Sequence, residues 1–265
     1  MNEVAGKVAL ITGGGSGMGR AIAESLAGDG ARVAVCGRRP EPLEETVARC
    51  TALGARALAV PTDVRDPDAV QACVDRVAAE LGTPELLVNS AAGNFICPAI
   101  DLSPNGWRAV VDIVLNGTFY TSRAVARALR DAGRGGSILN IVATYAWTGN
   151  PGTVHSAAAK AGVLNLTKTL AVEWAPLGIR VNAMAPGPVD TEAAAAHLFP
   201  TEEIRAAMAA GIPAGRLGTL DDVVWAARFL LSPRSSYITG ECLTIDGGEV
   251  LEQGMFAHSQ SAPKA

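Results

Sequence analysis

Two stretches of the sequence combine residue types and spacings that could do chemistry. In TGGGSGMGR, at 12–20, three glycines keep a TGxxxGxG spacing, and in HSAAAK, at 155–160, Ser156 and Lys160 stand four residues apart. Backbone N–H groups of a glycine-rich turn can approach a pyrophosphate, and residues four apart on a helix share a face. The positive charge of Lys160 would favour anionic intermediates. The sequence therefore suggests an enzyme that works with a nucleotide cofactor.

The elements that must position these residues follow a regular alternation. Short apolar runs, typical of parallel strands that helices cover on both faces, alternate with longer stretches of helical periodicity. The predicted strands are 7–12, 32–36, 56–60, 85–89, 137–142, 179–184 and 242–246. The predicted helices, most of which end in Gly, are 19–30, 42–54, 68–82, 119–133 and 156–178. We expect a single-domain, Rossmann-like α/β fold: a doubly wound, seven-stranded parallel sheet with helices on both faces.

The chain shows no sign of a second domain. Its 265 residues are 49% hydrophobic, which suffices for one full core, and no Pro/Ser-rich linker divides it. We expect residues 1–265 to form one dinucleotide-binding catalytic domain. An Ala-rich segment at about 191–215 breaks the alternation after the carboxyl end of a strand, where α/β proteins keep substrate lids.

Bulk properties argue against several partners. A net charge of -4 without any run of Lys or Arg argues against nucleic acid. No apolar stretch has the length of a membrane span or the pattern of a signal peptide, so we expect a cytoplasmic protein without a membrane partner. The cysteines are odd in number and lack a CxxC pair, which favours reduced packing residues over metal ligands; they are Cys36, Cys50, Cys73, Cys97 and Cys242.

The glycine-rich turn follows a predicted strand and precedes a predicted helix, which is the context that dinucleotide binding requires. A tight strand-to-helix turn without a ligand is the alternative. A pyrophosphate bound by the turn would lie at the positive end of the helix. The expected cofactor contacts in this turn are Gly13, Gly15, Ser16, Gly17, Met18 and Gly19.

The second predicted strand ends in VAVCGRR, at 33–39, and indicates which cofactor is preferred. Gly37 stands where a carboxylate would hold a ribose 2′-hydroxyl, and Arg38 and Arg39 follow it. A guanidinium can bind a 2′-phosphate that a carboxylate would repel, so NADP(H) is favoured over NAD(H). A plain surface position is the alternative for both arginines and fits Arg39 better.

Two further strand ends carry candidate cofactor contacts. Asp63 in TDV, at 62–64, could accept from an adenine amino group or cap a helix. Small residues in NSAAGNF, at 89–95, would let the backbone lie against a cofactor, unless they form only a tight turn. The candidate contacts in these two stretches are Asp63, Val64, Ala91, Ala92 and Gly93.

These motifs occur in the order found in the short-chain dehydrogenase/reductase family, which the chain resembles over residues 5–250. The resemblance rests on TGGGSGMG, NSAAG, an Asn in DIVLNGT, the helix that bears Lys160, and APGPVDT. It implies a single-domain NAD(P)(H) oxidoreductase that forms a homo-oligomer, with a homotetramer favoured, through long helices at 104–133 and 156–176. It also implies that Lys160 holds the nicotinamide ribose and Thr191 the nicotinamide amide. Further cofactor contacts implied near Thr191 are Pro186, Gly187 and Val189.

The sequence departs from the family's Asn-Ser-Tyr-Lys catalytic set at two positions. Ser156 stands where the usual tyrosine stands, and Ala143 stands where the usual serine does. Ordinary reduction of a ketone needs an acidic hydroxyl to protonate the alkoxide, and neither residue supplies one. Asn116 and Lys160 remain, and a new tyrosine, Tyr145, precedes Ser156 by eleven residues.

This combination resembles the NADPH-dependent 2,4-dienoyl-CoA reductases in their mitochondrial and bacterial form. Further agreement lies in AAGNFICPA (91–99), SPNGWRAVVDIVLNGTF (103–119), SAAAKAGV (156–163) and AVEWAPLGIRVNAMAPGP (171–188). The resemblance implies reduction of a 2,4-dienoyl-CoA to a 3-enoyl-CoA in β-oxidation of unsaturated fatty acids, with negative charge reaching the thioester oxygen. Tyr145 and Asn116 would donate hydrogen bonds to that oxygen, and Ser156 would be a polar support.

Each of these catalytic roles has a plainer alternative. Tyr145 could be a wall residue beside Trp147, Asn116 could pin a helix kink, and Ser156 could be an N-cap. His155 points elsewhere on the helix than Ser156 and is not expected to be catalytic.

Arg216, in IPAGRLG, could meet the CoA phosphates or make a structural ion pair. It completes the candidate substrate contacts, which are Arg38, Phe95, Tyr145, Ser156 and Arg216.

Two rival functions stay open. One is another short-chain reductase that acts on enoyl- or 3-oxoacyl thioesters, which 3-oxoacyl turnover insensitive to replacement of Tyr145 would favour. The other is a nucleotide-binding subunit without catalysis, which NADPH binding without turnover would favour. Retention of Asn116, Lys160 and a complete cofactor turn argues against the second rival.

Overall fold

One parallel sheet determines where the candidate functional residues lie. The structure, a computed structural model, describes residues 3–191 and 201–252. The strands are β1 (Val8–Thr12), β2 (Arg32–Gly37), β3 (Ala57–Pro61), β4 (Leu86–Asn89), β5 (Gly136–Ile141), β6 (Ile179–Pro186) and β7 (Cys242–Ile245). They lie in the order β3-β2-β1-β4-β5-β6-β7, and every neighbouring pair is parallel. The predicted seven-stranded parallel sheet is confirmed.

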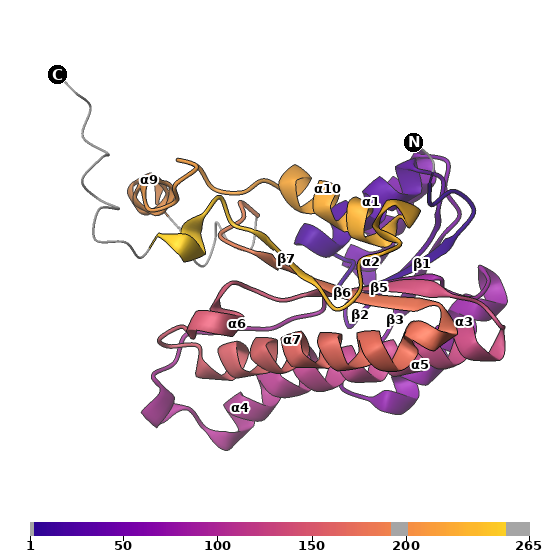
Figure 1. Cartoon of the computed structure of the whole chain (residues 1–265), viewed down its shortest axis with the longest axis horizontal. Helices are drawn as coiled ribbons and strands as arrows, with labels where there is room; N and C mark the ends of the chain where they lie inside the picture. Colours follow the sequence, from indigo (N-terminus) through magenta and orange to yellow (C-terminus); the bar gives the residue numbers. More distant parts are fainter. Residues whose placement is uncertain (1–2, 192–200, 253–265) are drawn as a thin grey trace.

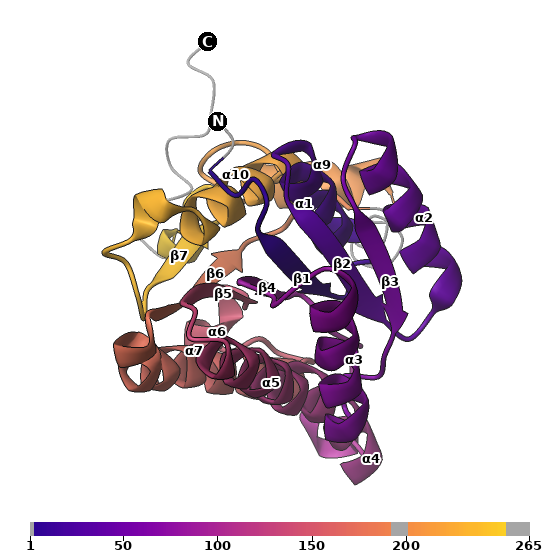
Figure 2. The same ribbon diagram turned by 90° about the vertical axis from the view of Figure 1, so that its right-hand side faces the viewer.

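Helices cover both faces of the sheet, as Figures 1 and 2 show. On one face lie α1 (Gly17–Gly28), α2 (Pro40–Ala52) and α10 (Leu220–Leu231). On the other face lie α3 (Pro67–Glu80), α5 (Gly117–Asp131) and α7 (Val154–Trp174). Each layer buries its own hydrophobic cluster against the strands. The doubly wound, Rossmann-like arrangement is therefore confirmed.

Strand β1 lies inside the sheet, between β2 and β4, and both of its faces are covered. All five of its residues are buried. Val8 and Leu10 belong to the cluster shared with α3 and α5, whereas Ala9 and Ile11 belong to the cluster shared with α1 and α10. Successive side chains of a strand point to opposite faces, so a sheet between two helical layers requires continuous apolar strands.

The predicted helices begin and end a few residues too late. The predicted helices include Gly30, Gly54 and Gly82, but each glycine lies two residues beyond the observed end of its helix. All three have a positive φ, of +84°, +88° and +110° respectively. A glycine in the left-handed region ends a helix and is not part of it.

Helix α10 was not predicted at all. A capping box marks its start: Thr219 Oγ1 accepts from the Asp222 N–H, and the Asp222 carboxylate accepts from the Thr219 N–H. This signal is present in the sequence as TLDD, because a hydroxyl residue three positions before an acid is typical of a helix start.

The remaining helical segments connect these layers. Helix α4 (Pro104–Val111), a π-helical turn (Asp112–Asn116) and α5 follow one another without a gap. Two shorter helices are α6 (Tyr145–Thr148) and α9 (Glu202–Ala210), and 3-10 turns lie at Ala99–Asp101, Ala175–Leu177, Pro233–Ser235 and Glu249–Leu251. No helix in the two described ranges is long and apolar enough to cross a membrane.

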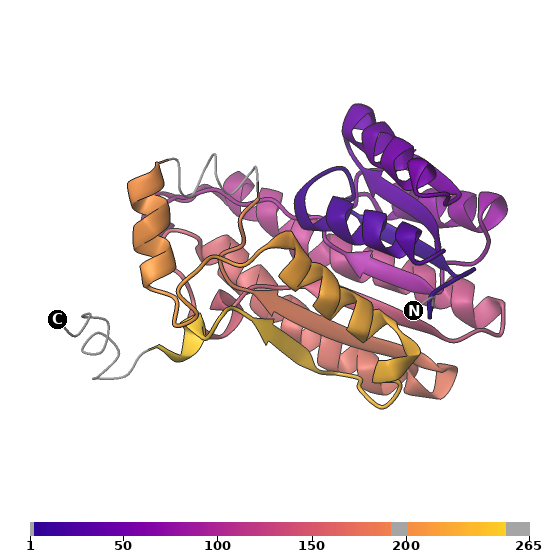
Figure 3. The same ribbon diagram turned by 90° about the horizontal axis from the view of Figure 1, so that it is seen from above.

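The segment at about 191–215, predicted as a substrate lid, is described in part. Residues 192–200 lie outside the described residues. Helix α9 stands outside the two helical layers, near the 3-10 turn that follows β7 (Figures 1 and 3). Arg205 of α9 forms an ion pair with Asp190, with Nη1 and Oδ1 2.9 Å apart. The role of the segment as a lid stays a prediction.

Candidate active site

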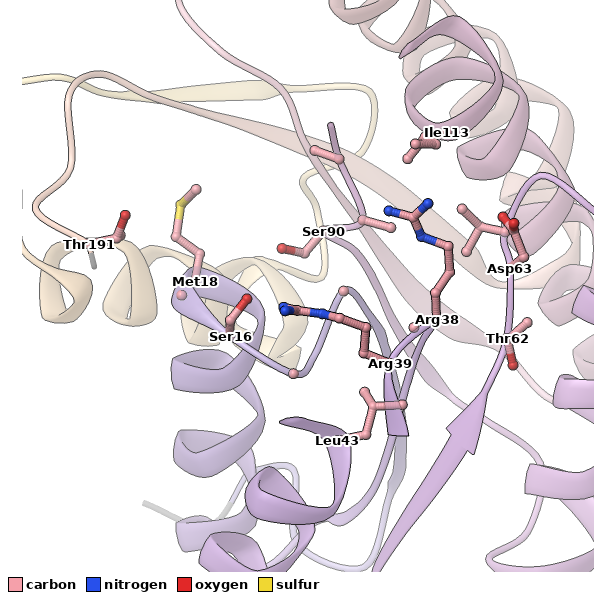
Figure 4. Close-up of a pocket in the computed structure, with 17 residues that line it drawn as sticks. Ser16, Met18, Arg38, Arg39, Leu43, Thr62, Asp63, Ser90, Ile113 and Thr191 are labelled. Atoms are coloured by element: carbon pink, nitrogen blue, oxygen red, sulfur yellow. The ribbon is translucent and has the colours of Figure 1, made fainter. Parts of the chain in front are cut away.

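A cavity of about 320 Å³ opens at the carboxyl edge of the sheet. It lies beside β1 and β4, where the strand order reverses and where doubly wound proteins bind their ligands. Figure 4 shows the side chains around it. The lining residues are Gly13, Gly15, Ser16, Gly17, Met18, Gly37, Arg38, Arg39, Leu43, Thr62, Asp63, Val64, Ser90, Ala91, Ala92, Ile113 and Thr191.

Glycines shape the first wall of this cavity. Gly13 has a φ of +65°, and a Cβ atom there would lie 2.9 Å from the Cα of Ala91. A Cβ atom on Gly19 would lie 2.5 Å from the carbonyl oxygen of Gly13. The turn after β1, the start of α1 and the turn after β4 therefore approach one another more closely than any residue with a side chain would allow.

The start of α1 suits an anionic ligand. Ser16 is the N-cap of α1 but makes no side-chain capping bond, so its hydroxyl does not compete for the first N–H groups of the helix. Arg20 Nη2 donates to the Gly15 carbonyl at 2.6 Å, and Thr46 Oγ1 donates to the Gly14 carbonyl at 2.9 Å. These bonds give two carbonyl oxygens of the turn a hydrogen-bond partner within the protein.

Charged side chains form the opposite wall. Arg38 and Arg39 extend into the cavity from the end of β2, and Asp63 lies beside Arg38 (Figure 4). The Asp63 carboxylate is held by Arg65 at N–O distances of 2.5 and 3.0 Å, and the Arg65 guanidinium lowers the pKa of Asp63. Helix α3 is capped by Asp66, so the predicted alternative of a helix cap for Asp63 is wrong. Within residues 3–191 and 201–252, Arg38 forms no ion pair of its own.

Most of the predicted cofactor contacts line the cavity. Those that do not are Gly19, Gly93, Lys160, Pro186, Gly187 and Val189. Five lining residues were not predicted as contacts: Gly37, Leu43, Thr62, Ser90 and Ile113. Gly37, Thr62 and Ser90 adjoin predicted contacts at strand ends, which was a usable signal. The other two are apolar positions in helical segments and gave none.

Tyr145 and Ser156 come together near the carboxyl end of β5. Tyr145 is the first residue of α6, and Ser156 lies in the first turn of α7, where its side chain is buried. Tyr145 Oη and Ser156 Oγ are 3.1 Å apart, and either hydroxyl can donate the hydrogen bond. The N-cap of α7 is Thr153, so the predicted alternative of an N-cap for Ser156 is wrong.

Lys160 lies one turn after Ser156 on the same buried face of α7. Its Nζ donates to the carbonyl oxygen of Ile141, the last residue of β5, at 2.5 Å. Burial lowers the pKa of Lys160 to about 8, because the charged form loses its hydration. The lysine can therefore carry a positive charge at neutral pH, beside the Tyr145–Ser156 pair.

Asn116 is the last residue of the π-helical turn between α4 and α5. Its Nδ2 donates to Asp112 Oδ1 at 2.8 Å. Asn116 thus lies at an irregularity of the helix, which agrees with the alternative prediction that it pins a helix kink. An amide nitrogen carries two hydrogens, so one remains after the bond to Asp112. A bond from Asn116 to substrate stays a prediction.

The other predicted substrate contacts, Phe95 and Arg216, do not line the cavity of about 320 Å³. Arg216 forms an ion pair with Asp222, with Nη1 and Oδ2 2.7 Å apart, and lines a second cavity of about 310 Å³. This is the structural ion pair that was one of the two alternatives predicted for Arg216. Phe95 is partly exposed, and its ring lies against the ring of His155, with 4.5 Å between centroids. Contact of Phe95 or Arg216 with substrate stays a prediction.

Known proteins resemble the chain over nearly its whole length. Residues 13–249 match the family described as Enoyl-(Acyl carrier protein) reductase. A protein of Bacillus subtilis (strain 168), named "Probable 2,4-dienoyl-CoA reductase, (2E)-enoyl-CoA-producing", is 49% identical over 92% of this chain and 97% of its own length. A peroxisomal 2,4-dienoyl-CoA reductase of Danio rerio, named as (3E)-enoyl-CoA-producing, is 40% identical over 91% of this chain and 81% of its own length.

Solved structures agree with these relatives. A short chain dehydrogenase from Bacillus anthracis shares 46% identity and a TM-score of 0.87, covering 96% of this chain and 100% of its own. A dehydrogenase from Agrobacterium tumefaciens with bound NADP shares 36% identity and a TM-score of 0.86, covering 94% of this chain and 98% of its own. The chain belongs to the short-chain dehydrogenase/reductase family of NAD(P)-dependent oxidoreductases.

Proposed function

We propose that the protein is an NADPH-dependent 2,4-dienoyl-CoA reductase that acts in the β-oxidation of unsaturated fatty acids. The observation that carries this proposal is the hydrogen bond between Tyr145 and Ser156. Ser156 occupies the position of the usual catalytic tyrosine, and the bond brings a tyrosine back to that position from α6. The acidic hydroxyl of the site is therefore relocated and not lost, which suits a substrate whose charge develops at a different atom. The names of the two dienoyl-CoA reductase relatives support the same substrate class.

The cavity residues fit a bound NADP(H). The glycine turn and the start of α1 suit the pyrophosphate, and the guanidinium of Arg38 suits a 2′-phosphate, because Asp63 is engaged by Arg65. Lys160 would hold the nicotinamide ribose, and Thr191 would hold the nicotinamide amide. When bound, the reduced nicotinamide supplies a hydride. The NADP-bound relative supports this choice of cofactor.

Titration with NADPH and NADH tests the cofactor preference. We expect tighter binding of NADPH, and we expect Arg38→Ser to weaken NADPH binding by roughly 10- to 100-fold while NADH binding hardly changes, since charged hydrogen bonds contribute about 1.5–3 kcal/mol. Arg39→Ser is the matched comparison. Equal affinity of the wild type for the two cofactors would contradict the preference.

The reaction requires stabilisation of charge on the thioester oxygen. Hydride addition at C5 of the dienoyl chain leaves a dienolate, whose negative charge extends to that oxygen. Tyr145 Oη would donate to the oxygen while it accepts from Ser156 Oγ, and the second amide hydrogen of Asn116 would complete the pair of donors. Lys160 adds a nearby positive charge. A proton taken from water then adds to C2 and gives the 3-enoyl-CoA.

A panel of thioesters tests the reaction class. NADPH consumption is followed with a 2,4-dienoyl-CoA, a 2-enoyl-CoA and a 3-oxoacyl-CoA, and each product is identified by mass spectrometry and NMR. We expect turnover with the dienoyl-CoA and a 3-enoyl-CoA as product. Preferred turnover of the 3-oxoacyl-CoA would favour a different short-chain reductase. NADPH binding without turnover of any of the three would favour a non-catalytic subunit.

The name of the Bacillus subtilis relative favours a second candidate product, a 2-enoyl-CoA. It would form if the dienolate took its proton at C4 in place of C2. Turnover in deuterated water separates the two outcomes, because the deuterium marks the carbon that was protonated. We expect deuterium at C2, and deuterium at C4 would establish the alternative product.

Assembly and location complete the proposal. A homotetramer is proposed from the family resemblance and a cytoplasmic location from the sequence alone. Analytical ultracentrifugation of the purified protein tests the first, and a monomer would contradict it.

A further inference from the structure

His155 precedes Ser156 and has no part in the reaction proposed above. Its side chain is completely buried, with 0% exposure. Its Nδ1 accepts a hydrogen bond from the backbone N–H of Ser156, at 2.8 Å. Its Nε2 is buried and has no hydrogen-bond partner among the described residues. Buried polar groups are nearly always paired, so an imidazole kept here at the expense of an unpaired nitrogen calls for an explanation.

The hydrogen bond to Nδ1 determines the protonation state of the ring. Nδ1 can accept a hydrogen bond only when it carries no proton, so the imidazole is neutral and its hydrogen is on Nε2. An imidazolium would direct a second N–H at the N–H of Ser156, and the two donors would repel each other. The bond therefore exists only with the neutral Nε2–H tautomer of His155.

This bond supplies an acceptor where α7 has none of its own. The Ser156 N–H belongs to the first turn of the helix, where no preceding helical carbonyl can accept it. Thr153 is the N-cap but makes no side-chain capping bond. The His155 side chain therefore caps α7 by accepting the N–H of Ser156. Ser156 is also the residue whose hydroxyl forms the hydrogen bond with Tyr145.

The ring of His155 also packs against a second aromatic ring. Phe95 meets it in an edge-on arrangement, with 4.5 Å between centroids and planes at 76°. The loop that carries Phe95 is tied to the turn before α7, since the Cys97 N–H donates to the Gly152 carbonyl at 2.8 Å. The imidazole is therefore fixed between the loop after β4 and the start of α7.

We propose that His155 is a positioning residue for the Tyr145–Ser156 pair. Its neutral imidazole fixes the backbone at Ser156 and thereby keeps Ser156 Oγ within hydrogen-bond distance of Tyr145. Its effect on turnover rests on the proposed function, because Tyr145 is the group whose placement it controls.

Two substitutions at position 155 separate the hydrogen bond from the bulk of the ring. His155→Leu removes the acceptor but still fills the space with a bulky side chain. His155→Asn keeps an acceptor, and the chain already contains such a bond, because Asn94 Oδ1 accepts from the N–H of Phe95 at 3.0 Å. We expect kcat on a 2,4-dienoyl-CoA to fall about 10-fold in the Leu variant, with KM little changed, and to recover most of that loss in the Asn variant. Equal losses in the two variants would overturn the proposal.

Leu170→Ala serves as the control for general destabilisation of α7. Leu170 is buried on the same helix and packs in the cluster shared with α3 and α5. We expect this variant to lower the melting temperature and to leave kcat unchanged. A matching loss of kcat would mean that any weakening of α7 disturbs turnover, and the proposal would fail.

A double-mutant cycle tests whether His155 acts through Tyr145. The Tyr145→Phe variant lacks the hydroxyl that Ser156 Oγ would orient. In this background His155→Leu should therefore lower kcat by less than about 2-fold. The same 10-fold loss in both backgrounds would show that His155 acts independently of Tyr145 and would overturn the proposal.

A spectroscopic measurement tests the inference without any substrate. The ¹⁵N spectrum of the imidazole rings distinguishes the two neutral tautomers, and comparison with His155→Asn assigns the signals of His155. We expect the Nε2–H tautomer at neutral pH. An Nδ1–H tautomer or an imidazolium would overturn the proposal, whereas the expected spectrum without dienoyl-CoA turnover would leave the positioning bond intact and refute only the proposed function.

Discussion

Tyr145 Oη lies 3.1 Å from Ser156 Oγ, although the two residues belong to different helices and stand eleven positions apart. Ser156 is buried, and Tyr145 is half-buried at the start of α6. A serine hydroxyl that donates to the phenol leaves the phenol hydrogen available for another acceptor. The pair thus joins the position of the family's usual tyrosine to Tyr145, the residue proposed to replace it.

Ser156→Ala should lower kcat on a 2,4-dienoyl-CoA by about 10-fold, at least as much as His155→Leu, because one hydrogen bond that orients Tyr145 contributes up to about 1.5 kcal/mol. The loss should be much smaller than that of Tyr145→Phe. In the double variant the two losses should not add, since both act on the same hydroxyl. Steady-state kinetics of the three variants checks this, and additive losses would mean that Ser156 has a separate role.

Lys160 should make stability depend on pH. Its pKa is about 8 in the folded protein, against a usual value of 10.5. Between these values the unfolded chain binds more protons than the folded protein, so the free energy of unfolding should rise as the pH increases through this range. The penalty for burying the ammonium group is fully present below about pH 8 and relieved at higher pH. The full effect is at most roughly 3 kcal/mol.

Lys160→Met provides the reference for this measurement, because other groups also titrate at high pH. Denaturant unfolding of both proteins without cofactor should show the variant to be more stable below pH 8, with the difference shrinking toward pH 10.5. A difference that stays constant over this range would show that Lys160 titrates at its usual pKa.

Arg65→Met should weaken NADPH binding, although Arg65 itself does not line the cavity. Arg65 lowers the pKa of Asp63 and neutralises its charge inside the cofactor cavity, beside Arg38. Without Arg65 the carboxylate would compete for Arg38 and repel a 2′-phosphate, so we expect the Kd for NADPH to rise by about 10-fold. The Kd for NADH should change less.

A second substitution tests this cause. Asp63→Asn in the Arg65→Met background should restore much of the NADPH affinity, because it removes the unneutralised charge. Arg76→Met is the matched control, since Arg76 forms an exposed pair with Glu80 on α3. No recovery in the double variant would assign the effect of Arg65 to something other than the charge of Asp63.

The sheet could be predicted from the sequence because its strands are covered on both faces. That coverage imposes continuous apolar runs, and the observed strands begin and end within two residues of the predicted ones. Helix ends were less predictable, since a glycine such as Gly54 looks like the last helical residue but lies beyond it. Helix α10 was missed although its capping box is visible in the sequence.

The cofactor cavity was also largely predictable, because turns after adjacent parallel strands must meet at one edge of the sheet. Pairings that depend on turn geometry were not. From the sequence, Asp63 could be an adenine contact or a helix cap. Its ion pair with Arg65 depends on the fold of the turn and is visible only in the structure. The bond between Tyr145 and Ser156 depends on the one-turn helix α6, which is too short for any periodicity to reveal.

The relocated tyrosine is the central claim, and kcat of Tyr145→Phe with a 2,4-dienoyl-CoA tests it most directly. The substitution removes one hydroxyl and keeps the ring. We predict a fall in kcat of about 10²-fold or more, as expected for loss of an oxyanion donor, with unchanged affinity for NADPH. The lost hydrogen bond should lower the melting temperature by only about 2–4 °C. Wild-type kcat in Tyr145→Phe would contradict the claim.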